Sequence, residues 1–192
     1  MPLGRVFTLP GVRPVLVVVL GFVLAHNILY TYVAPLLAAA GMDQRTDLML
    51  LVFGLASLLG IWIVGALIDR HLQALTLASI LLFGLSALMI GVGQGSTLLI
   101  VIAVAVWGLA FGGAATLFQT ALARTAGEAV DVAQSMLVTA WNAAIAGGGI
   151  VGGLILGWLG VTAFAPAVLL LLGATLVAVL TTRDHTTPRP SH

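Results

Sequence analysis

Six long apolar runs alternate with short polar segments along the chain. The runs cover residues 15–40, 48–68, 74–92, 97–118, 133–157 and 161–181. A helix needs ~20 mostly apolar residues to cross the hydrocarbon core of a membrane, and each run is close to that length. The pattern therefore predicts an all-α membrane protein with six transmembrane helices.

The polar segments set the expected boundaries. The tight segment 69–73 and the longer segment 119–132 are expected to be loops, and short loops make successive helices antiparallel neighbours. Three regions follow: a linker-like segment (1–14), a six-helix transmembrane domain (15–182) and a tail (183–192). The first run is longer than the apolar core of a signal peptide and holds polar residues, so we expect it to remain a span.

Arginine is distributed unevenly between the two sides that alternating spans define. Six arginines fall on one side, and Arg45 falls on the other. The six are Arg5, Arg13, Arg70, Arg124, Arg183 and Arg189. Because basic segments stay in the cytoplasm, both termini are predicted to be cytoplasmic, as in a multi-pass protein of the cell (inner) membrane.

Composition agrees with a membrane location. Hydrophobic residues make up 61% of the chain and charged residues only 7%. Soluble domains carry about 25% charged residues, so this inventory cannot cover a surface that faces water. The net charge of +1 gives no reason to expect nucleic acid as a partner, and the lipid bilayer is the expected one.

The chain offers little for catalysis. It has no cysteine, which excludes thiolate chemistry and cysteine-ligated metals. His26, His71, His185 and His192 are scattered over a span, a loop and the tail, without the spacing of a metal site. A serine protease needs a serine and a histidine facing each other, and His26 is the one histidine within a run. We expect no enzyme, no cofactor and no metal.

Several neutral polar residues nevertheless lie within the apolar runs or, like Gln119, at the end of one, whereas no acid or arginine lies in the middle of a run. These residues are His26, Asn27, Tyr30, Thr31, Gln119, Trp141 and Asn142. Polar groups are costly in hydrocarbon, so they should face the bundle interior or a cavity. Two interpretations stay open: they line the pathway of a neutral or weakly polar solute, or they join helices by hydrogen bonds.

Proline and glycine add local expectations. Pro35 cannot continue the hydrogen-bond ladder of the first run, so a bend is expected about one turn earlier, near Thr31. Gly149, Gly153 and Gly157 repeat every four residues in the fifth run. Gly108 and Gly112 have the same interval in the fourth run. Such stripes of small residues let helices approach closely, so these five glycines are predicted to mark packing interfaces.

Three segments together resemble one family of transporters. Residues 22–42 (FVLAHNILYTYVAPLLAAAGM) resemble the seventh helix of drug- or sugar-efflux antiporters of the major facilitator superfamily, of the arabinose-efflux-permease type. Residues 65–70 (GALIDR) resemble the superfamily's loop motif in its C-terminal-half copy. Residues 133–160 are similar to its eleventh helix, and the resemblance covers essentially the whole chain.

The loop motif carries a gating expectation. Gly65 would permit close helix contact, Asp69 would sit favourably at a helix N-terminus, and Arg70 would anchor the loop at the cytoplasmic interface. The resemblance implies that these charges form a cytoplasmic latch that steadies one access state. The family often continues with glycine and two basic residues, whereas this chain has Leu72-Gln73-Ala74. A weakened latch is therefore expected.

The resemblance also explains why the chain has six predicted spans. Transporters of this kind have twelve spans in two halves, each a 3+3 inverted repeat, and bind substrate between the halves. This chain resembles the C-terminal half, with residues 1–14 as the end of the central linker. The implied function is efflux of a small organic solute by alternating access. The chain would act as a homodimer or beside a second six-helix half. Protons are one candidate for the coupling ion, whose identity stays open. The alternative is a truncated fragment that transports nothing.

Overall fold

The computed structural model describes residues 3–183, and all regular secondary structure in that range is helical. The helices are α1 (Leu3–Phe7), α2 (Val12–Thr31), α3 (Val33–Ala39), α4 (Thr46–Val92), α5 (Thr97–Gly112), α6 (Ala114–Ala126), α7 (Val130–Leu159) and α8 (Phe164–Arg183). Three 3₁₀ turns join them: η1 (Asp43–Arg45), η2 (Gly127–Ala129) and η3 (Val161–Ala163). The expected tail beyond Arg183, with Arg189, lies outside the described residues.

Four helical stretches in this range are long and apolar enough to cross a membrane. They are Val12–Thr31, Asp43–Val92, Thr97–Leu159 and Val161–Thr181, with mean hydropathies between 2.0 and 2.5. These lengths and compositions confirm the expectation of an all-α protein of the membrane type.

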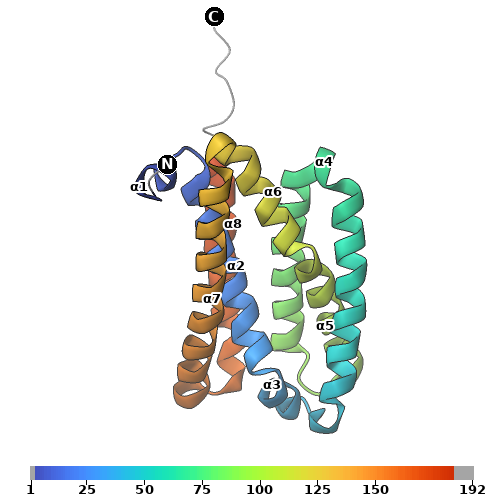
Figure 1. The fold of residues 1–192 in the computed structure, drawn as a ribbon. Coiled ribbons are helices and arrows are strands. Elements are labelled where there is room, and N and C mark those ends of the chain that lie inside the picture. Colours follow the sequence, from blue (N-terminus) through green and yellow to red (C-terminus); the bar gives the residue numbers. More distant parts are fainter. Residues whose placement is uncertain (1–2, 184–192) are drawn as a thin grey trace, which may run out of the picture.

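The longest helix, α4, turns back on itself. Its 47 residues are interrupted at His71, where the backbone leaves the helical region (φ −128°, ψ 25°). Figure 1 shows the two limbs running in opposite directions from this bend. Val64 and Ile68 of the first limb pack with Leu72 and Leu75 of the second. The limbs match the runs 48–68 and 74–92, and the predicted loop 69–73 is this bend.

The break expected from Pro35 is confirmed. Helix α2 ends at Thr31, and Tyr32 has non-helical angles (φ −112°, ψ 28°) before α3 begins at Val33. Because proline has no amide hydrogen, the ladder lacks one bond here. It resumes where Leu36 N donates to Tyr32 O at 3.1 Å.

The prediction of a loop over residues 119–132 is wrong. Helix α6 continues to Ala126, a 3₁₀ turn covers Gly127–Ala129, and α7 already begins at Val130. Residues 114–126 contain five alanines and no proline, so polar side chains alone do not stop the helix. The chain reverses at Gly127, whose φ of 52° and ψ of −126° suit glycine.

The expected linker is also partly helical. Residues Leu3–Phe7 form α1, and α2 includes residues 12–14. Val6 is fully buried in the main core cluster, so this segment packs on the end of the bundle. Nε of Arg13 donates to the carbonyl of Phe7 at 2.9 Å, which ties α1 to the start of α2.

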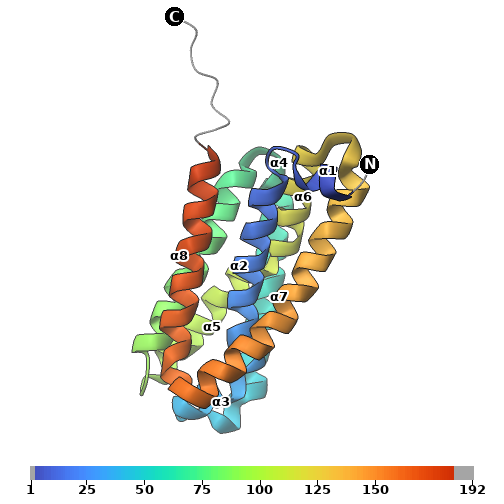
Figure 2. The same cartoon turned by 90° about the vertical axis from the view of Figure 1, so that its left-hand side faces the viewer.

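Helix α2 lies at the centre of the bundle, and Figure 2 shows it between α7 and α8. In its most apolar window 61% of the residues are buried, against 17% for the α4 stretch. Phe22 is fully buried and contacts the rings of Phe83, Phe111 and Phe118 from three other helices. The core therefore forms around α2, and much of the apolar surface of α4 points outward.

One end of the bundle collects most arginines. Figure 1 places α1, the bend of α4, the turn between α6 and α7 and the end of α8 at the same end. Of the arginines in residues 3–183, those at 5, 70, 124 and 183 lie in or next to these segments, and Arg13 lies at the start of α2 at the same end. Arg45 lies in η1, next to α3 at the opposite end. The arginines thus divide between the two ends of the bundle as their sequence positions predict.

Candidate functional site

A continuous cluster of rings fills the middle of the bundle. Its members come from α2, α4, α5, α6 and α7: Phe22, His26, Tyr30, Phe53, Phe83, Trp107, Phe111, Phe118 and Trp141. Neighbouring centroids lie between 3.4 and 6.5 Å apart. Aromatic pairs at such spacings stabilise a core beyond the burial of their area.

His26 is held inside this cluster by a hydrogen bond from another helix. Nε1 of Trp107 donates to Nδ1 of His26 at 3.1 Å, and both side chains are buried. The indole nitrogen can only donate, so Nδ1 is the unprotonated nitrogen and the ring is the neutral tautomer that carries its hydrogen on Nε2. The bond satisfies two polar groups that would otherwise be costly at this depth.

His26 also connects the buried rings to the surface of the bundle. It stacks on Phe111 with centroids 3.4 Å apart and planes 7° from parallel. Phe111 in turn lies 6.1 Å from Trp141 of α7, and Trp141 is partly exposed. A row of rings therefore runs from Trp107 through His26 and Phe111 to Trp141.

Beside Trp141 lies an open groove of about 200 Å³ between α6 and α7. Its lining consists of Ala115, Gln119, Leu137, Val138, Trp141 and Asn142. Asn142 is about 18 Å along α7 from its first residue, Val130, so the groove lies well inside the length of the helix. The structure thus brings Gln119 of α6 next to the neighbouring residues Trp141 and Asn142 of α7.

Apart from the indole N–H of Trp141, the polar side-chain groups that line the groove are amides. Nδ2 of Asn142 donates to the carbonyl of Val138 at 2.9 Å, one turn earlier in α7, which leaves Oδ1 as a free acceptor. The backbone carbonyl of Gln119 accepts from Nε2 of Gln134 at 2.9 Å, joining α6 to α7 beside the groove. The exposed side-chain amide of Gln119 can donate and accept.

The other predicted pathway residues lie apart from the groove. Asn27 is buried, and its Nδ2 donates to the carbonyl of Val23 at 2.9 Å within its own helix. Tyr30 is 43% exposed and stacks near His26, with centroids 5.1 Å apart. Thr31 is exposed at the last position of α2. Asn27 thus acts in packing, whereas Tyr30 and Thr31 lie on the surface.

Two residues that the sequence interpretation missed are important for this arrangement. Phe111 joins His26 to Trp141, but a lone phenylalanine in an apolar run gives no signal of its role. Tyr32 lies at the break between α2 and α3, and its hydroxyl donates to the carbonyl of Gly149 at 2.7 Å. Its position three residues before Pro35 could have indicated a role, because side chains at a helix break often bond to backbone groups of a neighbouring helix.

The glycines of α5 lie directly against α4. A Cβ at Gly108 would collide with the carbonyl of Phe53, and a Cβ at Gly112 with that of Ser57. The hydroxyl of Ser57 donates to the carbonyl of Gly108 at 3.1 Å across this contact. Small residues therefore allow the two backbones to touch here, as their four-residue interval predicts.

The glycines of α7 require a correction. A Cβ at Gly153 would lie 2.7 Å from the hydroxyl of Tyr32, but Gly149 and Gly157 have open space at that position. The close contacts fall instead at Gly148, where a Cβ would lie 2.5 Å from that of Asn27, and at Gly152, against the ring of Tyr32. Successive residues on a helix are about 100° apart, so a one-residue shift selects a different face.

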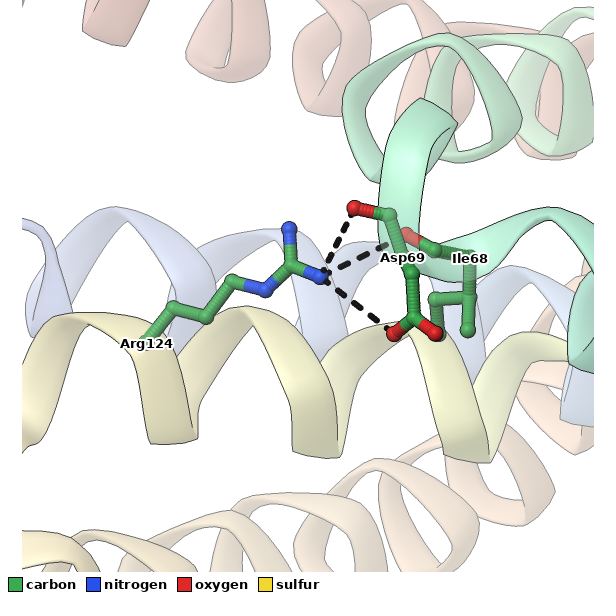
Figure 3. Close-up of polar contacts among 3 residues, drawn as sticks. All are labelled: Ile68, Asp69 and Arg124. Atoms are coloured by element: carbon green, nitrogen blue, oxygen red, sulfur yellow. Dashed lines mark hydrogen bonds and ion pairs between the residues drawn. The ribbon is translucent and has the colours of Figure 1, made fainter.

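An arginine from α6, Arg124, contacts the expected gating loop. Nη2 of Arg124 lies 3.3 Å from the carbonyl oxygen of Asp69, 3.5 Å from that of Ile68 and 3.9 Å from Oδ1 of Asp69 (Figure 3). The Asp69 side chain is 96% exposed, so the ion pair is strongly screened. Arg70 is exposed, and Gly65 has open space where a Cβ would lie. The contact links the bend of α4 to α6.

Within residues 3–183 no group of three or more metal-ligating side chains comes together. No protein-family model matches this chain.

Proposed function

We propose that the chain spans the membrane six times, with both termini in the cytoplasm. Two of the four apolar stretches, Asp43–Val92 and Thr97–Leu159, contain 50 and 63 residues. Two crossings need only ~40 residues, so each stretch is long enough to cross twice. The opposed limbs of α4 support two crossings in the first stretch. The gathering of arginines at one end of the bundle supports the orientation.

The proposed activity is transport of a small organic solute, with efflux by alternating access as the mode. The groove at Gln119, Trp141 and Asn142 carries this proposal. It presents free amide groups well inside the length of α6 and α7, on a surface that is otherwise apolar. Amide groups that face lipid carry a free-energy cost, whereas amide groups that face a solute pathway can bind the solute. No catalytic constellation or cofactor is part of the proposal.

The proposed family is the major facilitator superfamily, with this chain as a C-terminal six-helix half made of a 3+3 inverted repeat. The support is the resemblance of the first run, the GALIDR loop and the α7 segment. The contact of Arg124 with the bend of α4 adds a charged link at the place where the loop motif lies. In this proposal the bend and Arg124 act as the weakened cytoplasmic latch.

A half of this kind needs a partner across the groove. The groove is open to one side, and Gln119 and Asn142 are exposed there. A second copy of the chain, or a separately encoded six-helix half, would cover these polar groups. Native mass spectrometry from detergent would separate a particle of 19.7 kDa from one of twice that mass. A strictly monomeric chain that moves no solute contradicts the transport role.

Efflux of 1-naphthol, a small, neutral and fluorescent phenol used as the dye, from energised cells tests the transport role directly. Cells that express the chain should lose dye faster than cells that express Asn142→Leu at equal abundance in the membrane. Thr139→Val is the matched control, because Thr139 lies on the same helix outside the groove and bonds only to the carbonyl of Ser135. Equal rates for the chain and Asn142→Leu reject the groove as a pathway and favour a non-transporting fragment.

A further inference from the structure

The groove beside Trp141 has the size of one aromatic ring. Its volume is about 200 Å³, and an apolar cavity of about 150 Å³ is known to hold benzene. Trp141 forms part of its wall and is backed by Phe111 and Phe118, at centroid distances of 6.1 and 6.5 Å. Leu137 and Val138 add apolar surface. A flat ring fits such a wall because aromatic rings favour stacked or edge-on contact.

The free groups of the groove determine which polar substituent it accepts. One amide hydrogen of Asn142 bonds to the carbonyl of Val138, which leaves its second amide hydrogen and its Oδ1 available. An acceptor at this position calls for a solute that donates a hydrogen bond. The side chain of Gln119 can supply a second contact of either kind.

Charge is absent from the groove. None of its six lining residues is ionisable. On α6 the nearest charged residue is Arg124, which is engaged with Asp69 and the carbonyl of Ile68. On α7 it is Asp131, at the first turn of the helix. An ion that entered the groove would lose water without gaining a counter-charge, which is costly.

We propose that this groove binds an uncharged, planar solute with a hydrogen-bond donor, of which phenol is the simplest example. The ring packs on Trp141, and the donor bonds to Oδ1 of Asn142. Organic cations and anions of the same size are rejected. The proposal rests on the transport role above and names the class of solute for that site.

Fluorine NMR can test this without any transport. The chain has four tryptophans, so 5-fluorotryptophan labelling gives four signals, which single Trp→Phe variants assign. Trp141 reports on the groove. Trp62 and Trp158 are 70% and 82% exposed outside it, and they report on solutes that merely dissolve in the surrounding lipid. The probes are phenol, toluene, benzylammonium and benzoate, added to the full chain in lipid nanodiscs at neutral pH.

Phenol should shift the Trp141 signal saturably, while Trp62 and Trp158 change only in proportion to dissolved phenol. Asn142→Leu should raise the half-saturating concentration about fivefold, the loss expected for one neutral hydrogen bond. Thr139→Val should leave that concentration unchanged. An equal Trp141 response to toluene, or a stronger one to benzylammonium or benzoate, overturns the proposal, as does the absence of any saturable response.

The two proposals fail in different ways. Saturable phenol binding by a chain that shows no Asn142-dependent dye efflux overturns the transport role and leaves the assigned ligand class intact. Asn142-dependent efflux by a chain that does not bind phenol overturns the ligand class and leaves transport intact.

Discussion

Trp107 and His26 join α5 to the central helix α2 by a hydrogen bond of 3.1 Å between two buried rings. Each ring also has aromatic neighbours: His26 stacks on Phe111, and Trp107 meets Phe53 edge-on at 4.9 Å. The hydrogen bond and the ring contacts therefore hold the same two side chains in place. The bond explains how a histidine is accommodated inside an apolar bundle without a charged partner.

Replacing Trp107 with phenylalanine should destabilise the bundle by about 1–3 kcal/mol, because it leaves the acceptor nitrogen of His26 buried and unpaired. The free energy of unfolding in mixed micelles measures this. Nitrogen NMR of the imidazole adds a specific readout: the Nε2-protonated tautomer should be pure in the native chain and mixed in the variant. Trp158→Phe, at an 82% exposed position, should change neither quantity.

The contact between α2 and α7 predicts a contrast between adjacent glycines. A Cβ at Gly148 would lie 2.5 Å from the Cβ of Asn27 and 3.1 Å from the carbonyl oxygen of Leu24, whereas Gly149 has open space. Gly148→Ala should therefore cost about 1–3 kcal/mol in the free energy of unfolding, because backbones must separate. Gly149→Ala should be neutral or slightly stabilising, since alanine is the better helix former. Equal losses in both variants would mean that α7 is rotated from this arrangement.

Arg124 should matter more through backbone carbonyls than through its ion pair. Its Nη2 approaches the carbonyls of Asp69 and Ile68 at 3.3 and 3.5 Å, while the carboxylate lies 3.9 Å away on an exposed side chain. Arg124→Ala should lower the unfolding free energy by about 0.5–1.5 kcal/mol, the usual contribution of a hydrogen bond. Asp69→Asn keeps the carbonyls and should leave stability unchanged in both low and high salt. A loss on Asp69→Asn that disappears in high salt would assign the contact to charge instead.

Hydrophobic patterning predicted the helical stretches well, because their long apolar runs leave no other satisfactory state for the backbone. It failed at residues 119–126, where polar side chains suggested a loop. The polar side chains in this segment lie on the exposed face of α6 and do not end the helix. Helix termination depends on the backbone, and α6 ends where Gly127 adopts non-helical angles. Pro35 was more informative for the same reason: it acts on the backbone directly.

The candidate site was predictable only in part. Rarity of polar groups in a span identified Gln119, Trp141 and Asn142, which the fold brings to one groove. The same criterion selected Asn27, which bonds within its own helix and packs under Gly148. Which side of a helix faces a neighbour depends on tertiary packing, and a one-residue difference rotates a side chain by about 100°. Sequence spacing therefore found the correct helices and not always the correct faces.

The proposed topology can be tested with little background because the chain contains no cysteine. Single cysteines placed at Gln44 and Gln94 lie at one end of the bundle, in η1 and just before α5, where both side chains are exposed. Cysteines at His71 and Glu128 lie at the other end, at the bend of α4 and in η2, and are exposed as well. If the arginine-rich end is cytoplasmic, a membrane-impermeant maleimide added to intact cells should label Gln44→Cys and Gln94→Cys only. All four variants should react after the cells are opened, which controls for reactivity. Labelling of both His71→Cys and Glu128→Cys from outside, and of neither other variant, would mean that the orientation is reversed. Labelling of one member of either pair without the other would reject the two crossings assigned to the α4 stretch or to Thr97–Leu159.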